Sequence, residues 1–239
     1  MENLHIDQHI SRRYNEELEN LRNKVLIMGG MVENQCKNAL HALIQGDSSL
    51  ASTVATSDYQ INSLEVEIDA ECTEILARRQ PAASDLRLIL TVIKTIAHLE
   101  RIGDEAEKIG RFALKLANSH GAQSYYSDLH HLGELVIEML HDSLDAFARM
   151  DVEAAVEVVG RDPVVDQEFE ALTRMLITHM MEEPSGVRNV LHLNWCARSL
   201  ERIGDHSSNI CEYVIYLVKG HDVRHVSLQQ IQEKYIGKK

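Results

Sequence analysis

The same six-residue motif, Leu-Glu-Arg-Ile-Gly-Asp, occurs at residues 99–104 and again at residues 200–205. Each copy holds a glutamate and an aspartate four residues apart: Glu100 with Asp104, and Glu201 with Asp205. On a helix this spacing places the two carboxylates one turn apart on the same side. Carboxylates are hard oxygen ligands that suit Mg, Ca, Mn or Fe, and the pattern does not distinguish these from Zn or Ni. The motif therefore predicts two candidate sites for divalent or transition-metal ions.

The orientation of the motif follows from its apolar members. Leu99 and Ile102 belong to an apolar stripe, and a step of about 100° per residue puts Glu100 and Asp104 on the opposite face. We therefore expect the carboxylates of both copies to be accessible from outside. The alternative is a solvated row of charges in which Arg101 reaches a nearby carboxylate.

Two further features of the motif bear on a ligand site. Gly103 and Gly204 stand in mid-helix, where glycine costs about 1 kcal/mol relative to alanine, so their missing side chains would let another group approach closely. Two carboxylates do not fill a coordination sphere. The preceding helix in each half offers more oxygen ligands: Asp58, Asn62, Glu65 and Asp69 in the first half, and Asp162 and Asp166 in the second. These side chains either complete a metal site or are ordinary solvated surface groups.

The helices that carry these side chains are predicted from apolar residues at intervals of three and four. In the first half, one helix ends at Gly46, a second is capped by Asp47 and ends at Pro81, and a third runs to the polar stretch 118–121. In the second half, Asp151 caps the fifth helix and residues 184–186 break it before the sixth.

The related breaks in the two halves indicate an internal duplication. We predict an all-α fold of two tandem three-helix bundles, that is, six long antiparallel helices. The bounds that we expect are residues 7–118 for the first repeat, 122–220 for the second and 221–239 for a C-terminal tail.

Composition restricts the class of protein. The chain is 44% apolar but only 5% aromatic, with 3 Pro and 12 Gly, which favours long helices. Its formal charge of −13 repels polyanions, so we expect no nucleic-acid partner. The N-terminus lacks the apolar segment of a signal peptide, and Arg87 and Lys94 interrupt the most apolar stretch. We expect a soluble cytoplasmic protein that meets a membrane only through partners.

Other chemistry has little support in the sequence. The four cysteines never approach Cys-x-x-Cys spacing, so we expect buried, inert thiols. No phosphate-binding glycine loop or nucleophile motif occurs, so we expect neither an enzyme nor an organic cofactor. His206 follows Asp205 and could approach the second site. A ferritin-like di-iron protein remains an alternative through Glu138-x-x-His141, although it needs a second such pair. A second alternative is a structural helical adaptor that binds no metal.

These features together resemble the PhoU family, regulators of phosphate uptake and of the phosphate-starvation response in bacteria. The resemblance spans roughly residues 10–218 and rests on the duplicated motif, on the segment 81–87 that opens the third helix, and on the two three-helix units. It implies a PhoU-like fold and a cytoplasmic protein, commonly a homodimer. It also implies binding to the ATPase of a phosphate ABC transporter and to a sensor histidine kinase, which the protein would hold in its repressing state when phosphate is plentiful.

The resemblance further implies surface metal clusters at the two acidic motifs. The family often extends the motif by four residues to an asparagine, as Asn209 does in the second copy. The first copy has Lys108 instead, and its ammonium would oppose a cation. We therefore predict that the second site is occupied more readily than the first.

Overall fold

The computed structural model describes residues 12–57, 59–117 and 125–237, and these residues form helices and no strand. The helices are α1 (Arg12–Gln45), α2 (Ser48–Val54), α3 (Tyr59–Arg79), α4 (Ala83–Leu116), α5 (Tyr126–Arg149), α6 (Val152–Val159), α7 (Asp162–Glu182), α8 (Val187–Lys219) and α9 (Leu228–Tyr235). A short 3-10 turn, Pro184–Gly186, precedes α8. The all-α prediction is confirmed.

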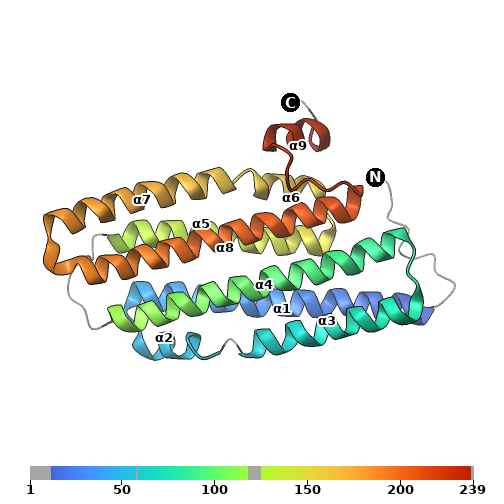
Figure 1. Ribbon diagram of the computed structural model, residues 1–239, viewed down its shortest axis with the longest axis horizontal. Helices are drawn as coiled ribbons and strands as arrows, with labels where there is room; N and C mark the ends of the chain where they lie inside the picture. The colour runs from blue at the N-terminus through green and yellow to red at the C-terminus, as the bar shows by residue number, and fades with distance from the viewer. Residues whose placement is uncertain (1–11, 58, 118–124, 238–239) are drawn as a thin grey trace.

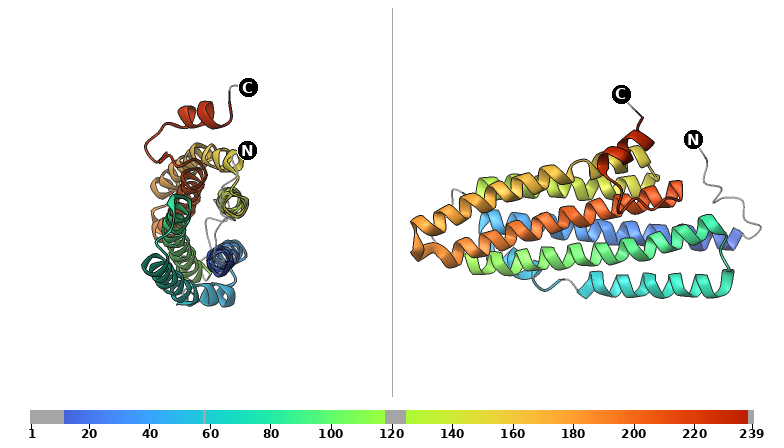
Figure 2. Two further views of the ribbon diagram at one scale, coloured as in Figure 1. Left: turned by 90° about the vertical axis from the view of Figure 1, so that its right-hand side faces the viewer. Right: turned by 45° about the horizontal axis from the view of Figure 1, so that its top comes forward.

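The long helices form two layers (Figures 1 and 2). One curved layer contains α3, α4, α8 and α7 in that order, and α1 and α5 lie side by side behind it. The most extensive contact joins α4 to α8, the third helices of the two repeats. Buried apolar side chains from both halves, such as Leu21, Leu99, Phe147 and Leu200, belong to one continuous core. The two repeats are therefore packed against each other along their third helices.

The two repeats begin their second helices in the same way. Gly46 and Met150 both have left-handed backbone conformations, with φ of 66° and 53°, which turn the chain after α1 and α5. Asp47 then accepts hydrogen bonds from the backbone N–H groups of Ser49 and Leu50, and Asp151 caps α6 in the same manner. Both predicted caps are confirmed.

The prediction of one continuous second helix in each repeat was wrong. In the second repeat the break between α6 and α7 contains Gly160 and comes just before Pro163. Proline has no N–H to donate to the carbonyl of Val159, and its ring would clash with that carbonyl. In the first repeat α2 ends at Val54, and the hydroxyls of Thr56 and Ser57 donate hydrogen bonds to backbone carbonyls of α2.

Other predictions have mixed outcomes. All four cysteines, Cys36, Cys72, Cys196 and Cys211, are free and buried, as expected. The boundary expected at residues 118–121 lies outside the described residues. In the C-terminal tail, Ser227 caps α9 and Ile231 is buried. No helix within the described ranges combines the length and apolarity needed to cross a membrane.

Candidate metal centre

Three carboxylates from two helices meet at the second copy of the motif. Glu201 and Asp205 lie one turn apart on α8, and Asp166 comes from α7. Each offers an oxygen, and these oxygens lie within 4.8 Å of one another. No other group of three acidic, histidine or cysteine side chains in the described part of the chain is as close. The structure thus brings together three of the predicted site residues.

The glycine of the motif explains how α7 comes so near. A Cβ atom on Gly204 would lie 3.3 Å from Cγ1 of Val165, which is tighter than an ordinary contact. Val165 is buried, and in the sequence of α7 it stands between Asp162 and Asp166. The absent side chain at Gly204 therefore allows α7 to present its acidic residues to α8.

Burial and mutual repulsion raise the pKa values of these acids. The pKa of Glu201 is raised to about 7, first by burial and then by the nearby charge of Asp205. The pKa of Asp162 is raised to about 6, first by burial and then by the charges of Asp205 and Asp166. The pKa of Asp205 is raised by burial and by Asp166. Asp162 is therefore an acidic neighbour of the three closely grouped carboxylates, and the group favours either a proton or a cation.

The expectation that all motif carboxylates are accessible was wrong for Glu201. Its exposed fraction is only 7%, because α7 covers the side of α8 that carries it. Its Oε1 accepts a hydrogen bond of 2.7 Å from Arg198, whereas its buried Oε2 has no hydrogen-bond partner among the described residues. A buried carboxylate oxygen without a partner is costly, and a cation would satisfy it.

Two neighbours expected near this site have other contacts. The Asn209 side-chain amide donates to the backbone carbonyl of Asp205 at 2.8 Å, which leaves only its carbonyl oxygen as a candidate ligand. His206 pairs with His98 of α4, their Nδ1 atoms lying 3.1 Å apart. His206 therefore belongs to the contact between the two repeats and not to the carboxylate cluster.

The first copy of the motif is less closely assembled. Glu100 and Asp104 are half-buried, and Asp104 faces Glu65 of α3, whose pKa is raised by burial, by Asp69 and by Asp104. Asn62 stands on α3 where α7 has Asp166, so an amide replaces one of the three closely grouped carboxylates of the second copy. The further candidate, Asp58, lies outside the described residues.

Lys108 does not point at the first pair of carboxylates. Its ammonium lies 3.0 Å from Glu105, a buried acid that also accepts hydrogen bonds from Ser199 and pairs with Arg202 of α8. The contacts of Ser199 and Arg202 join α4 to α8, and all three partners together satisfy Glu105. The positive charge of Lys108 is therefore paired with Glu105 on its own helix.

The residues of the second site fit a hard cation. Asp166, Glu201 and Asp205 supply only oxygen ligands, Asp162 adds to the surplus of negative charge, and one of the Glu201 oxygens is buried without a partner. Such a set suits Mg, Ca, Mn or Fe ions better than metals that require thiolate ligands.

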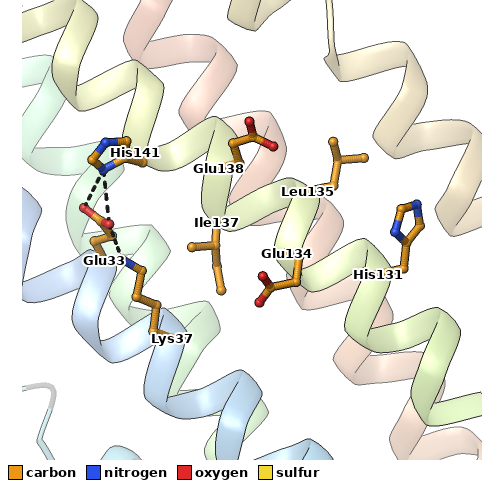
Figure 3. Close-up of a pocket in the computed structure, with 8 residues that line it drawn as sticks. All are labelled: Glu33, Lys37, His131, Glu134, Leu135, Ile137, Glu138 and His141. Carbon is orange, nitrogen blue, oxygen red and sulfur yellow. Dashed lines mark hydrogen bonds and ion pairs between the residues drawn. The ribbon is translucent and has the colours of Figure 1, made fainter.

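The pair behind the di-iron alternative lies elsewhere, on the outside of α5 (Figure 3). Glu138 and His141 line a surface pocket of about 490 Å³ between α1 and α5, and their side chains are 65% and 62% exposed. His141 contacts Glu33, which Lys37 also binds at 2.6 Å. This open, neutralised arrangement does not provide the enclosed carboxylate core that a di-iron oxidase requires.

Comparisons with known proteins agree with the duplicated architecture. The model of the PhoU domain matches residues 25–113 and 129–214. The chain is 50% identical to the phosphate-specific transport system accessory protein PhoU of Serratia marcescens, over 99% of this chain and 97% of that protein. The protein of the same name from Escherichia coli strain K12 is 49% identical over 100% of this chain and 98% of its own length.

Two solved structures share the fold. The crystal structure of PhoU from Pseudomonas aeruginosa has a TM-score of 0.85 at 50% identity, and the match covers 87% of this chain and 100% of that one. The crystal structure of the phosphate transport system regulatory protein PhoU from Streptococcus pneumoniae has a TM-score of 0.82 at 30% identity, covering 88% and 99%.

Proposed function

This chain belongs to the PhoU family, and on that premise we propose that it regulates phosphate uptake as an accessory protein of a phosphate-specific transport system. The observation that carries the proposal is its identity to accessory proteins of that name over nearly their whole length. The duplicated acidic motif, which suggested the family, lies within the matched segments.

In a finer form of the proposal, the long helical layers bridge the ATPase of a phosphate ABC transporter and a sensor histidine kinase. Both would be met on their cytoplasmic faces, and no catalysis by this chain is needed. The signal would come from a different affinity of this protein for two states of the transporter, since a partner shifts an equilibrium only by such a preference. Repression of the phosphate-starvation response at high phosphate follows.

A metal ion has a place in this proposal. Asp162, Asp166, Glu201 and Asp205 would hold a divalent or transition-metal ion, which supplies the positive charge that offsets their repulsion. The carboxylates come from both helices of the pair, so metal binding would hold α7 against α8.

We also propose that the protein is a homodimer, which light scattering on the purified protein tests.

The proposed function is tested by deleting the gene and measuring a phosphate-regulated reporter at high phosphate. We expect the reporter to be derepressed and a plasmid-borne copy to restore repression. Affinity capture from phosphate-replete cells should recover an ABC-type ATPase and a sensor kinase. Unchanged reporter activity would contradict the regulatory role, and capture of neither partner would contradict the bridging role alone.

A further inference from the structure

Arg198 lies on α8 three residues before Glu201 and is bonded to it. Its Nη1 donates to Oε1 of Glu201 at 2.7 Å, and its guanidinium lies 5.6 Å from the centre of the Phe169 ring on α7. The side chain of Arg198 is 54% exposed, whereas that of Glu201 is only 9% exposed. A solvent-accessible guanidinium therefore covers one oxygen of a buried carboxylate within the candidate metal centre.

The two copies of the motif differ at this position. Ala97 stands three residues before Glu100, so the first copy has no counterpart of Arg198. The cation that distinguishes the first copy, Lys108, binds Glu105 instead. Arg198 is thus a feature of the second copy at this position.

Arg198 and a metal ion would share the carboxylate of Glu201, with the guanidinium on Oε1 and the cation at the unpartnered Oε2. The hydrogen bond from Arg198 uses Oε1 of Glu201, and two positive charges a few ångströms apart repel each other strongly where water is partly excluded. Without metal, the arginine stabilises Glu201, because a buried carboxylate without any counter-charge is costly. With metal, the same arginine opposes binding.

The surroundings of Arg198 offer it other partners than Glu201. The side chain of Arg198 is 54% exposed, so water can replace Glu201 as the hydrogen-bond partner of the guanidinium. The face of the Phe169 ring remains within reach and attracts a cation. Arg198 can therefore be displaced without disturbing the core.

We propose that Arg198 is a displaceable counter-ion of the second metal centre. It neutralises Glu201 when metal is absent and leaves that carboxylate when a divalent cation binds. Its presence lowers the metal affinity of the site and so sets the metal concentration at which the site fills. The inference rests on the metal centre included in the proposed function.

The test compares Arg198→Gln with a reference chain that keeps Arg198. Both carry Glu100→Gln and Asp104→Asn, so that the first motif does not bind metal. Titration calorimetry with Mn²⁺ should show binding roughly two- to fivefold tighter in Arg198→Gln, the range expected from losing one partly exposed ion pair. In a chelator, Arg198→Gln should unfold at a lower temperature. Arg198→Lys, which keeps the charge, should bind metal nearly as weakly as the reference chain.

A matched control is Arg174→Gln on α7, which removes a 71% exposed arginine paired with Glu170 and should leave Mn²⁺ affinity unchanged. If the reference chain binds Mn²⁺ and Arg198→Gln binds it no more tightly, the role of Arg198 is refuted while the metal centre stands. If neither binds Mn²⁺, the metal centre is wrong and the role of Arg198 falls with it. Regulation of phosphate uptake is judged separately by the reporter.

Discussion

Val165 of α7 packs against the backbone of Gly204 in α8, with its Cγ1 3.3 Å from the place a Cβ atom would take. Gly204 stands directly before Asp205, and Val165 directly before Asp166. The close approach of the two helices is therefore centred on the carboxylates themselves. A residue that supplies no ligand is part of what assembles the site.

Replacing Gly204 with leucine should separate the two helices. The added atoms compete with Val165 and Val136 for filled space, so we expect a loss of about 1–3 kcal/mol in the free energy of unfolding. Metal affinity should fall as well, because Asp166 moves away. Denaturant unfolding and calorimetry measure the two effects. Adding Val165→Ala makes room and should recover part of both; undiminished metal binding in the single variant would contradict the account.

Local sequence patterns predicted the helices and their caps well. Leu99, Ile102 and Leu200 are buried as the helical periodicity predicted, because each stripe faces the shared core. Asp47 and Asp151 cap their helices, since capping depends only on the next three residues.

Contacts between helices were harder to predict. A helical wheel drawn for α8 alone places Glu201 away from the core, but it cannot show that α7 covers that face. The signal was present in the four-residue spacing of Asp162 and Asp166, which repeats the spacing of the motif acids. The role of Arg198 was missed because its partner is defined only once Glu201 is known to be buried.

The two motifs should differ in how much metal they bind. We expect Glu201→Ala with Asp205→Ala to remove more bound metal than Glu100→Ala with Asp104→Ala, because only the former dismantles the assembled cluster. Elemental analysis of protein purified without a nickel column measures the difference. Saturating metal at about 100 times its dissociation constant should also stabilise the intact chain by about 2.7 kcal/mol. Equal losses from the two double variants would refute the prediction.

The histidine pair between the repeats predicts a pH dependence of stability. Burial is the main reason that the pKa values of His98 and His206 are lowered to about 4, and the charge of Arg101 adds to it at both. An unfolded histidine has a pKa near 6.5. Between pH 6.5 and pH 4 the unfolded chain therefore binds more protons than the folded chain, and this contribution to stability falls as the pH falls.

His98→Gln removes one of these titrating groups and should flatten the pH dependence. The slope of the unfolding free energy over that range should fall by up to about 1.4 kcal/mol per pH unit. Denaturant unfolding in a chelator measures it without interference from metal. His130→Gln, at a histidine whose side chain is 51% exposed, is the control. Slopes that change equally in both variants would show that burial at the α4 and α8 contact is not the cause.

Two adjacent glycines of α1 should respond oppositely to alanine. A Cβ atom on Gly29 would lie 2.5 Å from Cδ2 of Leu144 on α5, and Leu144 is 7% exposed, so its side chain has little freedom to move aside. We expect Gly29→Ala to destabilise the chain by about 1–3 kcal/mol through overpacking. A Cβ atom on Gly30 meets nothing within 4 Å. Gly30→Ala should therefore stabilise it by up to about 1 kcal/mol through helix propensity alone.

The same contact recurs at Gly133 of α5, where a Cβ atom would lie 2.5 Å from Cδ1 of Leu40 on α1. Gly133 follows Gly29 by the same number of residues as Leu144 follows Leu40, so the duplication produces a reciprocal pair of close contacts between the first helices of the repeats. Gly133→Ala should cost about as much as Gly29→Ala, roughly 1–3 kcal/mol. Thermal and denaturant unfolding of the three alanine variants decide the matter: if Gly29→Ala or Gly133→Ala is as stable as Gly30→Ala, α1 and α5 are not held this closely in solution.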